Sequence, residues 1–178
     1  MKLLIKGALA ALLLTGAATS ASAQATATAN ANGSVTIFRP ITVAKNADLK
    51  FGNIVKPGGG TGTASVAADS GGALTVGGGV VDLASGDASS AAKFTVAGEG
   101  GQAFTLAVAD SFVITNTVDN ITVTTSQDVA DGTQSLSGAL GDGSDGTKEV
   151  HVGGSISVPS SISTGLFTGS FSVTATYN

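Results

Sequence analysis

The stretch LFTGSFSVTATYN, residues 166–178, decides the fold, because its apolar and polar side chains alternate from Phe167 onward. Alternation with a period of two predicts a β-strand with one face on a core and the other toward solvent. We therefore expect a strand over Leu166–Tyr177. Chain ends fray unless they are tied down, so this strand is expected to be structural. Its core face is predicted to carry Phe167, Gly169, Phe171, Val173, Ala175 and Tyr177.

The same period recurs along the rest of the chain, and no helical period follows residue 23. Short alternating runs separated by clusters of Gly, Asp and Ser predict an all-β domain, a sandwich or a barrel. Pro40 has no amide for a ladder, so the first run is expected to lie at an edge or to switch sheets there. The other expected strands are Ser34–Val43, Ala47–Ile54, Thr63–Ala68, Ala73–Leu83, Lys93–Ala97, Ala103–Val108, Phe112–Asn116, Asn120–Thr125, Thr133–Leu140 and Thr147–Pro159.

The first 23 residues have the features of a secretory signal peptide. Lys2 and Lys6 precede a short apolar run over residues 7–18, and the small residues Ala21 and Ala23 form a cleavage site. The run is shorter than the roughly 20 apolar residues that span a bilayer. We expect export to the periplasm of a Gram-negative bacterium, then the cell surface or secretion, and a mature chain from Gln24 with no transmembrane segment.

The segment after this leader, QATATANANGSVTIF over residues 24–38, also alternates. We divide the mature chain into an N-terminal extension, residues 24–33, and a β-sandwich domain, residues 34–178. The parity of the extension continues into the domain. One parity carries only apolar residues and glycine, namely Ala25, Ala27, Ala29, Ala31, Gly33, Val35 and Ile37.

Composition limits the partners and the sources of stability. Without Lys2 and Lys6 the chain keeps six basic against twelve acidic side chains, a net charge of −6. This charge disfavours nucleic acid and anionic lipid as partners, because both bind through clustered Lys and Arg. The chain has 26 Gly, no Cys and no Trp, so no disulfide can form and each residue buries little apolar area. Stability is expected to come from strand pairing or from a partner chain.

Residues that carry out catalysis are scarce, and we expect neither an enzyme nor a bound cofactor or metal. His151 is the only His, and alternation places it opposite Val150 and Val152, which predicts a solvent-facing ring. A secreted hydrolase is disfavoured for want of candidate residues. The segment Gly141–Gly146 is expected to be a hairpin turn; a calcium loop is the alternative, but the closing Glu is missing.

Two segments carry a family resemblance: Leu49–Gly52, with the sequence LKFG, and the ending Gly169–Asn178. With the signal peptide, they make the chain resemble chaperone–usher fimbrial subunits and, more closely, the exported bacterial family called domain of unknown function 4402. Fimbrial subunits end in an alternating strand with a penultimate Tyr and a Gly fourteen residues from the end. Tyr177 and Gly165 occupy these positions.

The resemblance implies an immunoglobulin-like β-sandwich that lacks its last strand and is completed by a donor strand, an extended segment supplied by another chain. A periplasmic chaperone would fill the groove first, and the extension of the next subunit would replace it at an outer-membrane usher. The protein would be a non-enzymatic subunit of a head-to-tail fibre of identical or related subunits. The groove strand would run through Gly165, Phe167, Gly169, Phe171, Val173, Ala175 and Tyr177.

Two alternatives stay open. Residues 24–33 form either a donor strand or a disordered tether, because Ala is smaller than the side chains usual in donor strands and no Cys is present. The protein is alternatively a self-sufficient exported β-sandwich that binds a carbohydrate or another surface ligand. Such a module would be a stable monomer, whereas a fibre subunit should lose assembly when the extension is deleted.

Overall fold

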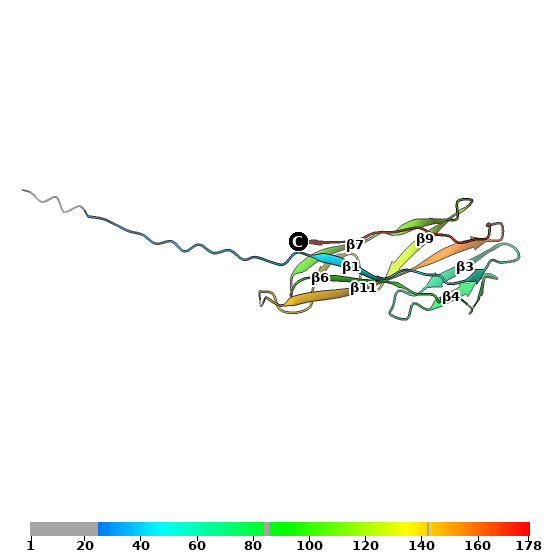
Figure 1. Ribbon diagram of the computed structural model, residues 1–178, viewed down its shortest axis with the longest axis horizontal. Coiled ribbons are helices and arrows are strands. Elements are labelled where there is room, and N and C mark those ends of the chain that lie inside the picture. The colour runs from blue at the N-terminus through cyan, green and yellow to red at the C-terminus, as the bar shows by residue number, and fades with distance from the viewer. Residues whose placement is uncertain (1–24, 84–85, 142) are drawn as a thin grey trace, which may run out of the picture. The chain divides into compact units, whose positions relative to one another are not determined.

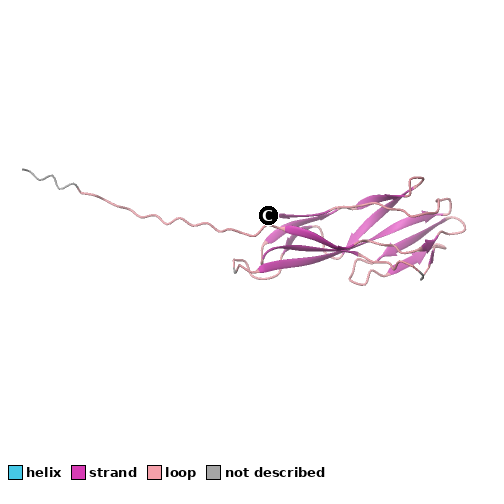
Figure 2. Ribbon diagram, viewed as in Figure 1, coloured by secondary structure: helices cyan, strands magenta, loops and turns pink. Residues whose placement is uncertain are grey.

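The computed structural model describes residues 25–178 apart from 84–85 and 142. The expected signal peptide lies outside the described residues. The chain divides into two units, with the boundary between Thr36 and Ile37. In the first unit, residues 25–36 contain no strand and are exposed. All regular structure in the described chain is β-strand (Figure 2).

The domain from Ile37 onward contains the strands labelled in Figure 1. The alternation that predicted them is visible in their burial, since buried and exposed residues alternate along the central strands. The strands are β1 (Thr42–Ala47), β2 (Ile54–Val55), β3 (Thr61–Val66), β4 (Leu74–Gly77), β5 (Val81–Asp82), β6 (Ala92–Glu99), β7 (Ala103–Val108), β8 (Ser111–Thr115), β9 (Asn120–Gln127), β10 (Gly132–Ser135), β11 (Asp145–Pro159) and β12 (Val173–Tyr177).

The strands form two main sheets and a ribbon, and every pairing is antiparallel. The larger sheet has the order β1-β6-β11-β3-β4, with β9 pairing both β11 and β8. The smaller sheet has the order β10-β7-β12, and β2 pairs β5. The first and last strands, β1 and β12, each lie at the edge of a different sheet.

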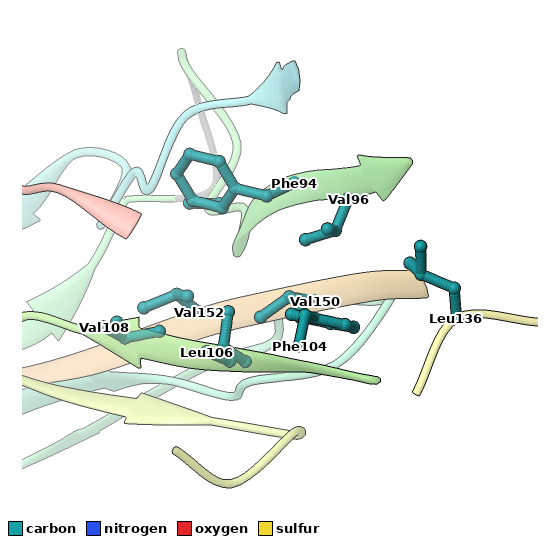
Figure 3. Close-up of a cluster of buried hydrophobic side chains, with 9 residues drawn as sticks. Phe94, Val96, Phe104, Leu106, Val108, Leu136, Val150 and Val152 are labelled. Atoms are coloured by element: carbon teal, nitrogen blue, oxygen red, sulfur yellow. The ribbon is translucent and has the colours of Figure 1, made fainter. Parts of the chain in front are cut away.

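The main core lies between the two sheets. Phe94 and Val96 of β6 and Val150 of β11 face the fully buried side chains of Phe104 and Leu106 on β7 (Figure 3). One buried cluster thus joins three strands from two sheets, which is the packing of a β-sandwich. The all-β expectation is confirmed.

A pair of glycines lets β11 change partners along its length. Its first part pairs β6 up to Val152, and its second part pairs β3 from Gly154. A Cβ on Gly153 would lie only 2.3 Å from the carbonyl oxygen of Val66. The end of β3 can therefore pass close to β11 at this point only because residue 153 has no side chain.

The two ends of the domain differ from the sequence-based strands. The strand expected over Ser34–Val43 begins only at Thr42, after Pro40, whose ring removes a ladder donor. The strand expected over Leu166–Tyr177 pairs continuously only from Val173. Before that point, Thr168 makes a single isolated bridge to Thr115.

Turns shorten other predicted strands. The run Ala73–Leu83 divides into β4 and β5, because Gly78 and Gly79 take positive φ angles of 63° and 84°. The run Thr133–Leu140 stops at Ser135, although Leu136 remains in the core with 3% of its surface exposed. Alternation thus located the apolar face, while glycine conformation set where β4 ended.

Candidate functional site: a groove beside the C-terminal segment

A groove of about 540 Å³ opens in the domain between two extended segments. One wall is the end of β1 with the segment that follows it, residues 45–53, and the other is Leu166–Phe171, which precedes β12. Beyond the end of β1, residues 48–53 form no continuous ladder strand, and neither does Leu166–Phe171. We call this feature the C-terminal groove.

Phenylalanine rings line the C-terminal groove. The ring of Phe171 stacks on Phe112 with centroids 4.9 Å apart and meets Phe94 edge-on at 5.9 Å. Phe51 and Phe167 also line the groove, and both are only half-buried. Aromatic side chains normally bury 150–250 Å² each. Their partial exposure here leaves an apolar surface that a further element could cover.

Within the described part of the chain, Thr168 is the one residue of the C-terminal wall whose backbone groups make hydrogen bonds. Thr168 exchanges two hydrogen bonds with Thr115, of 2.9 and 3.0 Å. Its neighbours Phe167 and Gly169, and Phe171 beyond them, make no backbone hydrogen bond within the described part of the chain. In a strand, adjacent residues direct their amide and carbonyl groups to opposite sides. This wall therefore has the properties of an open sheet edge.

The opposite wall follows the same pattern. Lys50 exchanges hydrogen bonds of 2.8 and 3.0 Å with Ser90. Leu49 and Phe51 on either side of it make no backbone hydrogen bond to any described residue. An unpaired edge is a template for pairing with another strand. The groove thus has an available backbone edge on both walls.

The charges at the rim of the groove balance. Lys45, Asp48, Lys50 and Asp87 contribute two positive and two negative side chains. Lys45 donates a hydrogen bond of 2.5 Å to Asp48, and this bond and its charge hold the pKa of the Asp48 carboxyl below 3.8. Because these four charges sum to zero, the rim does not favour a charged occupant over a neutral one.

A polar network fixes the loop that leads into the C-terminal wall. Ser163 donates its backbone N–H to Asp119 at 2.8 Å, and Asn116 donates to the Ser163 hydroxyl at 2.8 Å. The hydrogen bonds from Ser163 lower the pKa of Asp119 below its ordinary 3.8. The network therefore attaches the start of the wall to the hairpin between β8 and β9.

The seven C-terminal residues expected to form a groove strand lie in one continuous segment. Phe167, Gly169 and Phe171 line the C-terminal groove, whereas Gly165 lines a separate cavity of about 140 Å³. Tyr177 accepts a hydrogen bond of 2.7 Å from the Glu99 amide and so links the two sheets. Val173 and Ala175 lie in β12 and pack against the main core.

The seven residues of the N-terminal set are all exposed, and none lies in a strand. Val35 is 81% and Ile37 is 84% exposed, although both are large β-branched hydrophobic side chains. Ala25, Ala27, Ala29, Ala31 and Gly33 are likewise exposed.

Two further expectations meet the structure here. His151 does not face solvent: its side chain is only 12% exposed, and its Nδ1 lies 2.7 Å from the Asp128 carboxylate. The segment expected to be a turn ends in β11, which begins at Asp145; Arg39 donates to the Gly143 carbonyl and forms an ion pair with Asp145. Among the described residues, which leave out residue 142, no three His, Cys, Asp or Glu side chains could hold a metal ion.

Sequence reasoning missed the groove residues that come from the middle of the chain. Phe112 and Ile114 on β8 and Phe94 on β6 were assigned only to strands, and they contribute to the lining. The alternation of β8, with both residues on one parity, was the available signal. Nothing in the sequence indicated that this face would be left partly uncovered.

Comparison with known proteins places the domain in a family without assigning it a role. No helix in the described part of the chain has the length and hydropathy to cross a membrane. No curated protein and no solved structure matches the chain. The sequence profile described as Domain of unknown function (DUF4402) matches residues 41–177, almost all of the sandwich, and the chain therefore belongs to this family.

Proposed function

We propose that the protein is a non-enzymatic structural subunit of a bacterial surface fibre, in which the N-terminal extension of one copy enters the C-terminal groove of another. The observation that carries the proposal is the groove of about 540 Å³, with apolar rings inside it and unpaired backbone on both walls. An added β-strand suits both features, because its main chain pairs with the walls and alternate side chains enter the groove.

The extension, taken from here on as residues 25–37 because its alternation continues to Ile37, also supports this proposal. Residues 25–36 are exposed, lie outside every sheet and carry no charge. Their alternation gives an extended segment one apolar face, which is the property of a strand that lacks a sheet. A neutral strand also suits a rim with balanced charges.

A contact between the extension of one copy and the groove of another joins two different surfaces. Such heterologous contacts continue without closing unless a rotation brings them into a ring. A fibre is the open-ended product. Export, a periplasmic chaperone and an outer-membrane usher belong to this proposal through the resemblance to fimbrial subunits.

The test uses the mature chain from Gln24 and a matched variant in which residues 25–37 are replaced by a Gly/Ser sequence of equal length. Both proteins are unfolded in guanidinium, refolded by dilution at several concentrations and measured by light scattering. We expect the mature chain to form polymers whose size increases with concentration. The matched variant should remain a folded monomer, because it has an intact groove and no apolar strand to donate.

The two results that contradict the proposal are clear. Equal assembly of both proteins would exclude the extension as the donor. A mature chain that stays monomeric, with a high unfolding midpoint independent of concentration, would favour the alternative of a self-sufficient binding module. The complete burial of Phe104 and Leu106 within one copy is the observation that favours this second candidate.

A further inference from the structure

We infer that Val35 and Ile37, rather than the preceding alanines, are the residues that anchor the extension in the groove of a second copy of this chain. This inference rests on the proposed function and identifies which part of the extension carries the affinity. It divides the extension into an anchor of two aliphatic side chains and an alanine-containing segment that contributes little.

The size of the groove is the first argument. Apolar space that is left unfilled destabilises a packed interface in proportion to its volume. The groove measures about 540 Å³, and each alanine offers only one methyl group. On the apolar parity of the extension, Val35 and Ile37 are the two residues with larger side chains. They are therefore the side chains able to fill the space between the Phe rings.

The exposure of these two residues is the second argument. Val35 is 81% and Ile37 is 84% exposed. Burial of apolar area is the main favourable term in association, and it increases with the area removed from water. Two residues apart on an extended segment, both side chains point to the same face and can enter one groove together.

The length of the wall is the third argument. Leu166–Phe171 contains six residues, equal to about 20 Å of extended chain. A strand of that length directs three side chains of one parity into the groove, and Gly33, Val35 and Ile37 form such a set. When these three residues occupy the groove, residues 25–31 lie beyond the end of the wall and do not pair with it.

The test compares two variants of the mature chain that keep its length and net charge. The first carries Val35→Ser and Ile37→Ser; the second carries Ala27→Ser, Ala29→Ser and Ala31→Ser. Each is refolded by dilution, and polymer size is measured by light scattering and domain folding by circular dichroism. We expect the first variant to fold and remain monomeric, and the second to assemble within about twofold of the unmodified chain.

The outcomes separate this inference from the function on which it rests. Assembly lost in the alanine variant, or retained in the Val35/Ile37 variant, would overturn the anchor while leaving strand donation in place. If the unmodified chain itself never assembles, the proposed function fails, and the anchor fails with it.

Discussion

At the scale of single residues, Tyr177 connects the two sheets at the end of the chain. Its hydroxyl lies 2.7 Å from the amide of Glu99, a residue that is 4% exposed. A Cβ on Gly98 would collide with the same phenol, so the ring packs directly on the backbone of β6. Sequence reasoning placed Tyr177 on the apolar face but gave no reason for its hydroxyl, which serves to satisfy a buried amide.

Replacing Tyr177 with Phe should lower the free energy of unfolding by about 1–2 kcal/mol, because the Glu99 amide would lose its partner in a buried setting. Urea denaturation of the two proteins measures the difference. Thr176→Val, on the exposed face of the same strand, is the control and should change stability by less than about 0.5 kcal/mol. Equal effects of the two substitutions would show that the hydroxyl has no structural role.

Asp119 gives the domain part of its acid sensitivity. Hydrogen bonds from Ser163 lower the pKa of the Asp119 carboxyl below 3.8 in the folded state. A lowered pKa means that the ionised form stabilises the fold above about pH 4, and that this contribution is lost as the pH falls through the folded pKa. Asp119→Asn should therefore reduce stability at pH 7 and flatten its decline between about pH 5 and pH 2.

Urea unfolding at a series of pH values compares Asp119→Asn with the unmodified protein. We expect the two stability curves to converge toward low pH. Curves that stay parallel over the whole range would contradict the role of the ionised carboxylate.

At the scale of elements, β11 holds the larger sheet together because it pairs β6, β9 and β3. Gly153→Ala should cost about 1–3 kcal/mol of unfolding free energy, since the new methyl would meet the Val66 carbonyl at 2.3 Å. Thermal and urea unfolding measure the cost. Ser157→Ala, at an exposed position on the same strand, is the control and should be nearly neutral. A stable Gly153→Ala protein would mean that β3 can move away from β11.

The elements could be predicted from the sequence where the alternation was clear. The predicted Ala103–Val108 coincides with β7, and Thr147–Pro159 covers most of β11. The predicted strand ends were wrong for physical reasons. β1 begins only after Pro40, and β4 ends where Gly78 and Gly79 take positive φ angles that the alternation pattern does not report. The sequence could not predict which strands pair, because alternation with a period of two identifies the buried face of a strand and not its neighbouring strand.

At the scale of the whole molecule, the domain has a fully buried core and a groove whose apolar side chains are only partly covered. Phe104 and Leu106 are fully buried, while the rings of Phe51, Phe167 and Phe171 stay half-buried around the groove. The sequence predicted the C-terminal wall of this site through its alternation and its resemblance to fimbrial subunits. It could not predict the opposite wall or the lining from β8, which the tertiary fold brings together.

Assembly should raise the stability of each domain through linkage. A partner that binds only the folded state stabilises it by RT ln(1 + [L]/Kd), or about 2.7 kcal/mol at a hundredfold excess over Kd. The unfolding midpoint of the mature chain should therefore increase with protein concentration. The Gly/Ser-extension variant should show a constant midpoint, and a concentration-dependent midpoint in that variant would point to a contact elsewhere.

The most direct test of strand addition is amide hydrogen exchange at the walls of the groove. The amides of Phe51, Phe167 and Phe171 make no hydrogen bonds to described residues, whereas the Thr168 amide already bonds to Thr115. Exchange is measured residue by residue in the Gly/Ser-extension monomer and in the assembled mature chain. The account predicts that Phe51, Phe167 and Phe171 become protected on assembly while Thr168 is protected in both states. Equal, rapid exchange of the three Phe amides in monomer and polymer would contradict it.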